Sequence, residues 1–272
     1  MRVRLSGALI AVVLVFAGAG CAPRSAQTGT SASPASRAPA AQAHGAPERG
    51  PQHPAAPPAP TPVVWPSEPP MPGHAKSGRI VVLGDSVVSG SGITQPGETL
   101  SQWLGQLLGR PAVTIGGGGI TATLVTKLGE IPGDTTTVVV YAGSNDVVAA
   151  STGVDRAQAE RQIRIFEVEF DRLAHGLRER VPQAELAFVT VRDLGRAGLA
   201  NARVAKDVLS AATHEWDAHE RAVAGTLGVR VVIDTETDPA WYVAADYTPE
   251  GFHPRNVAVA KLAHDLAEQL RP

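Results

Sequence analysis

Four short segments of the chain contain the residue types that acyl transfer needs. Ser86 ends a Gly-Asp-Ser segment, glycines occupy positions 116–119, Asn145 lies in a Gly-Ser-Asn-Asp segment, and Glu250 precedes His253 by three residues. A serine hydroxyl becomes a nucleophile when a histidine takes its proton and a carboxylate orients that histidine. Backbone N–H groups and side-chain amides stabilise the oxyanion that forms. The four segments therefore indicate a serine-dependent acyl-transfer site.

The elements that position these segments are predicted from the pattern of apolar residues. Short apolar runs predict strands at 79–83, 112–115, 135–141, 184–191 and 229–233. Helical spacing of apolar residues predicts helices at 98–108, 121–128, 156–181, 209–227 and 256–270. Strands that are apolar throughout and alternate with helices are typical of a parallel sheet that is covered on both faces.

All four candidate segments come after predicted strands. The Ser86 segment follows the first strand, the glycine run follows the second, and the Asn145 segment follows the third. The segment with Glu250 and His253 lies between the fifth strand and the last helix. Ligands of open parallel sheets bind beyond the carboxyl ends of the strands. We therefore expect the four segments to converge on one edge of the sheet.

The order and wording of these segments resemble the SGNH/GDSL hydrolase superfamily. The blocks of that family run Gly-Asp-Ser, a glycine, Gly-x-Asn-Asp and Asp-x-x-His, and the resemblance covers most of residues 78–272. It implies a flavodoxin-like, three-layer α/β fold with a doubly wound parallel sheet. It also implies that Ser86 is the nucleophile and His253 the general base. The backbone N–H groups of Ser86 and Gly119 and the amide of Asn145 then form the oxyanion hole.

The third member of the triad departs from the family pattern. The acid three residues before the histidine is Glu250, where the family has aspartate. A glutamate places its carboxylate one methylene further out, and carboxylate identity varies among such triads. Asp246 lies on the same loop and is an alternative. The register favours Glu250, and both residues stay open at this point.

The first 77 residues do not read as part of a folded domain. Arg2 and Arg4 precede an apolar stretch at 8–16, as in a bacterial export signal at 1–20. The only cysteine, Cys21, follows directly, so the segment resembles a lipoprotein signal and predicts lipidation of Cys21. Residues 21–77 are rich in proline and alanine and predict a disordered tether. We expect an extracytoplasmic protein anchored to the membrane, with a soluble secreted or periplasmic form as the alternative.

Charge and composition narrow the classes of partner. The formal net charge is −2 and charged residues make up 18% of the chain, so no large basic field is available for nucleic acid. The glycine run lacks the spacing of a nucleotide-binding loop. His214 and His219 have no carboxylate ligand set near them in the sequence. We expect no cofactor, no metal, no nucleic-acid partner and a monomeric protein.

The expected reaction is hydrolysis of a carboxylic ester through an acyl intermediate on Ser86. An extracytoplasmic location favours O-acyl groups of envelope or extracellular glycans as the substrate. Three alternatives remain, because one fold serves many chemistries. They are a lipid esterase of the lysophospholipase or thioesterase type, an acyltransferase, and a non-catalytic carbohydrate-binding domain.

Overall fold

The computed structural model describes residues 77–95, 97–198 and 204–271. They contain a five-stranded parallel sheet with strand order β2-β1-β3-β4-β5. The strands are β1 (Arg79–Gly84), β2 (Ala112–Gly116), β3 (Thr135–Tyr141), β4 (Glu185–Val189) and β5 (Val231–Ile233). This is the order of flavodoxin-like doubly wound sheets. The predicted fold class is therefore confirmed.

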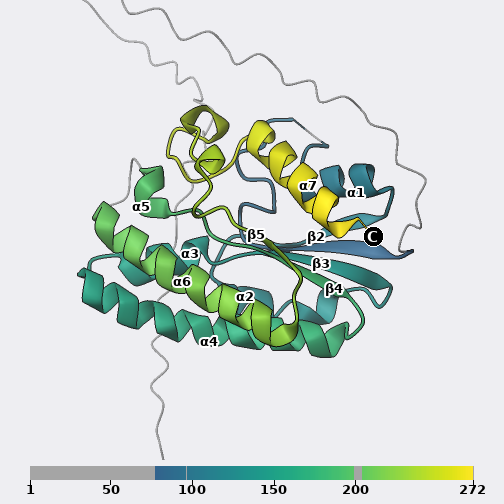
Figure 1. Ribbon diagram of the computed structural model, residues 1–272, viewed down its shortest axis with the longest axis horizontal. Coiled ribbons are helices and arrows are strands. Elements are labelled where there is room, and N and C mark those ends of the chain that lie inside the picture. Colours follow the sequence, from purple (N-terminus) through teal and green to yellow (C-terminus); the bar gives the residue numbers. More distant parts are fainter. Residues whose placement is uncertain (1–76, 96, 199–203, 272) are drawn as a thin grey trace, which may run out of the picture. The chain divides into compact units, whose positions relative to one another are not determined.

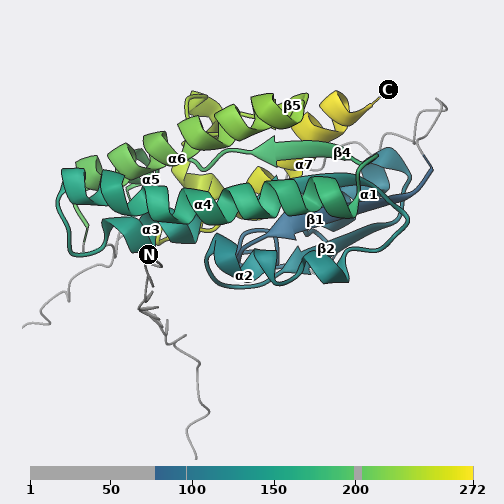
Figure 2. The ribbon, with the colours of Figure 1, turned by 90° about the horizontal axis from the view of Figure 1, so that it is seen from below.

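Helices cover both faces of the sheet (Figure 1; Figure 2). One face carries α1 (Leu100–Leu108) and α7 (Asn256–Leu270). The opposite face carries α2 (Thr121–Val125), α3 (Ser144–Ser151), α4 (Arg156–Arg180) and α6 (Lys206–Leu227). The shorter helical segments are α5 (Leu194–Ala197), η1 (Leu128–Glu130), η2 (Pro239–Trp241) and η3 (Ala244–Asp246).

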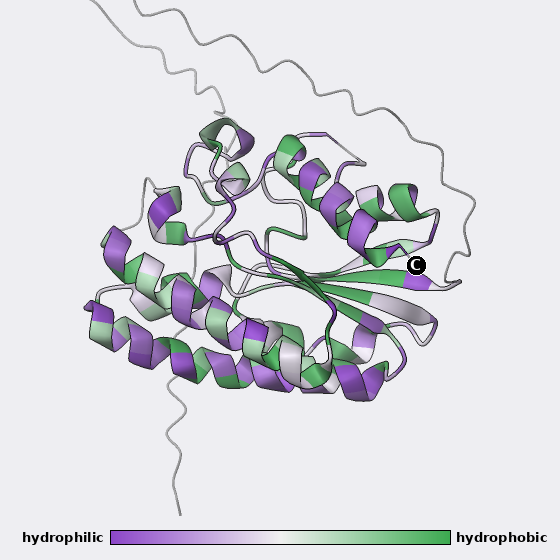
Figure 3. Ribbon diagram, viewed as in Figure 1, coloured by the Kyte–Doolittle hydropathy of each residue, from purple (hydrophilic) through white to green (hydrophobic). Residues whose placement is uncertain are grey.

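Alternate side chains of the strands build two separate cores. On β1, Val81 and Leu83 pack with the α4–α6 layer, while Ile80 and Val82 pack with α1 and α7. The reason is that successive residues of a strand point to opposite faces of the sheet. Figure 3 shows hydrophobic residues along the strands and hydrophilic residues over much of α4 and α6. Burial of both faces explains why the strands are apolar throughout.

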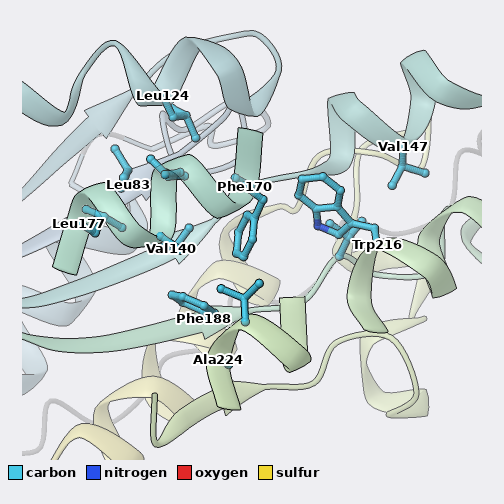
Figure 4. Packing of buried hydrophobic residues seen from close by; sticks show 14 of the residues in the cluster. Leu83, Leu124, Val140, Val147, Phe170, Leu177, Phe188, Trp216 and Ala224 are labelled. Atoms are coloured by element: carbon cyan, nitrogen blue, oxygen red, sulfur yellow. The ribbon is translucent and has the colours of Figure 1, made fainter. Parts of the chain in front are cut away.

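The largest core side chains gather between β4, α4 and α6 (Figure 4). The ring of Phe170 meets Phe188 and Trp216 edge-on, with centroid separations of 5.5 and 5.4 Å, an arrangement that the ring quadrupoles favour. Trp216 also lies against Gly143, where an added Cβ would come within 2.2 Å of the indole. Gly143 has a φ of +111°, so glycine suits both the backbone and the space. The core thus reaches the segment that carries Asn145.

Several element boundaries differ from the prediction, and at the start of α1 polar residues set the boundary. α1 begins at Leu100 instead of residue 98, because Thr99 and Gln102 form a capping box. The helix predicted at 121–128 ends at Val125, and a 3₁₀ turn follows. The strand predicted at 184–191 spans 185–189, α6 begins at residue 206 instead of 209, and β5 begins at 231 instead of 229. α3 and α5 were not predicted; α3 starts with Ser-Asn-Asp, which has low helix propensity.

The N-terminal predictions lie outside the described residues. They concern the signal segment (1–20), Cys21 and the tether up to residue 76. Lipidation and export therefore stay predictions. In the part of the chain that the structure describes, no helix combines the length and the apolar composition that a membrane span requires.

Candidate active site

Ser86 lies on the turn that follows β1. Its Oγ is 3.1 Å from Nε2 of His253, although the two residues are far apart in the sequence. The neighbouring Asp85 is buried and accepts a hydrogen bond from the Val87 N–H at 2.9 Å, which closes the turn. Burial raises the pKa of Asp85 to about 7, and the bond from Val87 opposes this rise. The turn thus holds the Ser86 hydroxyl against the imidazole.

The loop between η3 and α7 supplies the histidine and its carboxylate. His253 Nδ1 lies 3.0 Å from Glu250 Oε1. With the Nδ1 proton donated to the carboxylate, Nε2 is an acceptor that faces the Ser86 hydroxyl. Partial burial raises the pKa of Glu250, but hydrogen bonds from Thr248 and His253 outweigh burial, and the pKa is lowered overall. The three side chains therefore form one hydrogen-bonded series that ends in an ionised acid.

Asp246, the alternative acid, occupies a different place. It ends η3, and its backbone carbonyl accepts a hydrogen bond from the Arg255 N–H at 2.7 Å. Burial raises the pKa of its carboxyl, against the opposing charge of Lys261. Among the described residues, no hydrogen bond joins the Asp246 carboxylate to His253, whose Nδ1 contacts Glu250. The structure thus brings Glu250, and not Asp246, to the imidazole.

The segments that contain the predicted oxyanion donors follow three neighbouring strands, and these strands end at the same level of the sheet. Gly84 at the end of β1 pairs with Gly116 of β2 and with Tyr141 of β3. The Asn145 Nδ2 donates one proton to the Gly119 carbonyl oxygen at 2.9 Å, which leaves its second amide proton for another acceptor. Within the described ranges, the backbone N–H groups of Ser86 and Gly119 have no acceptor. These N–H groups are therefore free to stabilise a developing oxyanion.

Asp146 holds the loop that contains Gly119. Its buried carboxylate accepts hydrogen bonds from the Thr121 N–H at 3.0 and 3.1 Å and from the Thr121 hydroxyl at 3.0 Å. Burial raises the pKa of Asp146 to about 7, although the bonds from Thr121 favour the ionised form. Together with the bond from Asn145 to the Gly119 carbonyl, the first turn of α3 holds this loop at two points.

Arg192 is a buried residue of the site region that sequence reasoning missed. It follows β4, and its guanidinium donates to the carbonyl oxygens of Trp241, at 3.3 Å, and Gly251. Its Cζ also lies 3.4 Å from the centroid of the Tyr247 ring, a cation–π contact. Arg192 therefore links the end of β4 to the loop of Glu250 and His253. Its position directly after a strand was the signal that could have found it.

Thr248 is a second residue that sequence reasoning missed. Its hydroxyl lies 2.6 Å from Glu250 Oε1 and 3.2 Å from the His253 backbone nitrogen. Thr248 follows no strand and belongs to no family block, so only its place in the same loop marks it in the sequence.

The remaining histidines have neighbours that the sequence did not reveal. His219 Nε2 lies 2.9 Å from Asp171 Oδ1, and His214 Nε2 lies 3.2 Å from Glu236 Oε1. Each of these two histidines thus meets a carboxylate from a segment distant in the sequence. Among the described residues, no group of three or more histidine, cysteine, aspartate or glutamate side chains could hold a metal ion.

Comparison with known proteins finds a family model that covers all the segments of the candidate site. The model of the GDSL-like lipase/acylhydrolase family matches residues 82–258. No curated protein matches the chain. The described fold is similar to a lipase from a goat rumen metagenome (11% identity, TM-score 0.55), covering 72% of this chain and 98% of that one.

Two further solved structures share this fold. An extracellular lipase from Streptomyces rimosus is 16% identical, with a TM-score of 0.52, and the match covers 71% of this chain and 100% of that one. A carbohydrate esterase family 2 enzyme from Corynascus thermopiles is 15% identical, with a TM-score of 0.51, and the match covers 75% of this chain and 67% of that one. At these identities the likeness concerns the fold.

Proposed function

This chain belongs to the GDSL-like lipase/acylhydrolase family and is an ester-bond hydrolase, and we propose that Ser86 is its nucleophile. In this proposal His253 is the general base and Glu250 is the carboxylate that orients it. The observation that carries the proposal is the series of contacts from Ser86 Oγ to His253 Nε2 (3.1 Å) and from His253 Nδ1 to Glu250 Oε1 (3.0 Å). Nucleophile, base and orienting acid are all within hydrogen-bonding distance.

The reaction proceeds in two acyl transfers. Ser86 Oγ attacks the ester carbonyl carbon while His253 Nε2 takes the hydroxyl proton. The tetrahedral intermediate then expels the alcohol, which receives that proton from His253, and an acyl-Ser86 ester remains. Water attacks this ester with His253 again as the base, and the acid product leaves with Ser86 restored. Glu250 stabilises the imidazolium that forms in both steps.

Charge on the carbonyl oxygen is stabilised at the ends of β1, β2 and β3. The backbone N–H groups of Ser86 and Gly119 and the free amide proton of Asn145 are the proposed donors. Donors aimed at charge that develops only in the transition state lower the barrier more than they strengthen substrate binding. The bonds that hold Gly119 and Thr121 to α3 keep this arrangement in place before the substrate arrives.

For the substrate we propose a short acyl group on an envelope or extracellular glycan. The proposal rests on the expected extracytoplasmic location, where acylated glycans are available; the apolar cavity beside the Ser86 turn, with a volume of about 10 Å³, is room for about one water molecule and belongs to the core between the sheet, α1 and α7. Its lining residues are Val87, Leu100, Tyr141, Trp241, Tyr247, Pro254, Ala258, Val259 and Leu262. We expect kcat/KM for an aryl acetate to be at least about tenfold higher than kcat/KM for an aryl octanoate. The reverse preference would assign a lipid ester.

The nucleophile is tested with an aryl phosphonate that reacts with activated serines. The wild-type protein should gain one phosphonyl group, detected as a mass increase and mapped to the Ser86 peptide. Ser86→Ala should remain unlabelled and should lose esterase activity by about 10⁴-fold or more. Ser89→Ala, a neighbouring serine on the same turn, is the matched control and should label normally. Wild-type activity in Ser86→Ala would refute the proposal.

For localisation we propose a lipid anchor at Cys21. Cys21 is the only cysteine of the chain, so no other thiol can be modified. In cells, Cys21→Ala should move the protein from the membrane fraction to the soluble fraction without changing esterase activity. A wild-type protein that is already soluble would contradict the anchor.

A further inference from the structure

The carboxylate of Glu250 needs support that an aspartate would not need. Glutamate has one more rotatable bond than aspartate, and this side chain is 37% exposed. Fixing such a side chain costs conformational entropy. A single hydrogen bond to His253 must offset this cost alone. A second contact is present at the same atom: the Thr248 hydroxyl lies 2.6 Å from Oε1 of Glu250, the oxygen that also accepts His253 Nδ1–H.

The protons of this cluster can be assigned without conflict. Thr248 Oγ1 has three polar neighbours: Glu250 Oε1 at 2.6 Å, the His253 carbonyl oxygen at 3.1 Å and the His253 N–H at 3.2 Å. A hydroxyl carries one proton, and the carboxylate is both the nearer acceptor and the charged one. Thr248 therefore donates to Glu250 and accepts from the His253 N–H. One hydroxyl thus joins the acid to the backbone of the base.

Thr248 is itself held in place by the loop. Its N–H donates to the His253 carbonyl oxygen at 2.9 Å, and its own carbonyl accepts from the Gly251 N–H at 2.7 Å. Its methyl group packs against Gly92, where an added Cβ would lie 3.2 Å from Thr248 Cγ2 and 3.0 Å from His253 Cβ. A β-branched side chain has few χ1 states. The hydroxyl is therefore already directed at the carboxylate.

We infer that Thr248 is a positioning residue that holds the Glu250 carboxylate on His253 Nδ1. In this way it lets a glutamate fill the place where the family has aspartate. Thr248 does not contact the reacting atoms and acts through Glu250. The inference rests on the proposed roles of Ser86, His253 and Glu250.

The test compares Thr248→Ala with Thr248→Ser. Both variants lose the packed methyl group, and only the serine keeps the hydroxyl. With aryl acetate, Thr248→Ala should lower kcat about 10–100-fold while KM stays within about twofold, because a charge-assisted hydrogen bond is lost. Thr248→Ser should recover most of this loss. Thr226→Ala, which removes an exposed hydroxyl on α6, is the control for the chemical change itself.

A double-mutant cycle separates positioning from general support of the fold. In a Glu250→Gln background, Thr248→Ala should lower kcat only slightly further, because the charged acceptor of the Thr248 hydroxyl is already gone. Equal kcat in Thr248→Ala and Thr248→Ser, or a full additional loss on top of Glu250→Gln, would overturn the inference.

An NMR measurement that needs no substrate tests the role of Thr248 separately from the proposed function. In ¹⁵N-labelled protein, the His253 Nδ1 proton should give a downfield resonance that Glu250→Gln abolishes. The resonance should persist in Thr248→Ser and be lost or shifted upfield in Thr248→Ala. If Ser86→Ala remained fully active, the proposed function would fail, and this resonance would still decide the role of Thr248. An unchanged resonance in Thr248→Ala would reject it.

Discussion

The two halves of the proposed active site are held in different ways. Ser86 lies on the turn after β1 and Asn145 in the first turn of α3 after β3, and the paired residues Gly84 and Tyr141 place the ends of these strands at the same level of the sheet. His253 lies on a loop well beyond the end of β5. This loop is held by an isolated bridge between Tyr247 and Pro254 and by individual contacts from Arg192 and Thr248.

This difference affects how each half responds to substitution. The strand-borne half is placed by many backbone hydrogen bonds and by the buried core beneath it, so single changes there act mainly on the chemistry of the side chain removed. The loop-borne half depends on a few polar contacts. Loss of one such contact would move His253, the proposed base, relative to Ser86, and small displacements of catalytic groups have large kinetic costs.

Among the residues that support the Ser86 nucleophile, the largest effect is expected from the acid of the loop-borne half. Glu250→Gln keeps the shape of the side chain and deletes its charge, so His253 loses the partner that stabilises its imidazolium. We expect kcat to fall by about 10³-fold. Asp246→Asn is the matched control on the same loop and should stay within about tenfold of wild type. Steady-state kinetics with an aryl acetate give both values, and the reverse ranking would transfer the role to Asp246.

A smaller effect is expected in the strand-borne half. Asn145→Ala removes a proposed oxyanion donor, and kcat should fall by about 10²-fold with little change in KM, because the lost bond strengthens in the transition state. The variant also loses the bond to the Gly119 carbonyl. The thermal midpoint should nevertheless change little, since Asp146 still holds Thr121. A change in KM alone would assign Asn145 to substrate binding.

The smallest effect on catalysis is expected at the anchor of the loop. Arg192→Met leaves two carbonyl oxygens without their donor, so kcat should fall about tenfold and the thermal midpoint by about 5 °C. Arg196→Met removes an exposed arginine that lies 4.0 Å over the Tyr242 ring and is the control. If Arg192→Met lowered only the thermal midpoint, Arg192 would support the fold and not the alignment of His253.

Much of the fold could be predicted because its signals are local. The apolar run at 135–141 and the helix at 256–270 have the predicted bounds, since hydrophobic periodicity over one element reports directly on its burial. Boundaries set by polar contacts could not be read in this way. The start of α1 depends on the Thr99–Gln102 capping box, and α3 begins in a segment of low helix propensity that is held by contacts with the preceding loop.

The sequence by itself, with the family resemblance, indicated the strand-borne half of the proposed site. Ser86, Gly119 and Asn145 each follow an apolar run, and parallel strands bring such positions to one edge whatever the side chains elsewhere. The sequence also indicated His253, through its family block, but left its acid open between Glu250 and Asp246.

Only the tertiary structure decided which carboxylate meets the imidazole and what holds it there. Glu250 reaches Nδ1 because the turn of the loop directs it, and Thr248 shares the same carboxylate oxygen. Arg192 joins this loop from the end of another strand. Contacts of this kind depend on side-chain directions in a loop and on residues distant in the chain, and neither leaves a periodic pattern in the sequence.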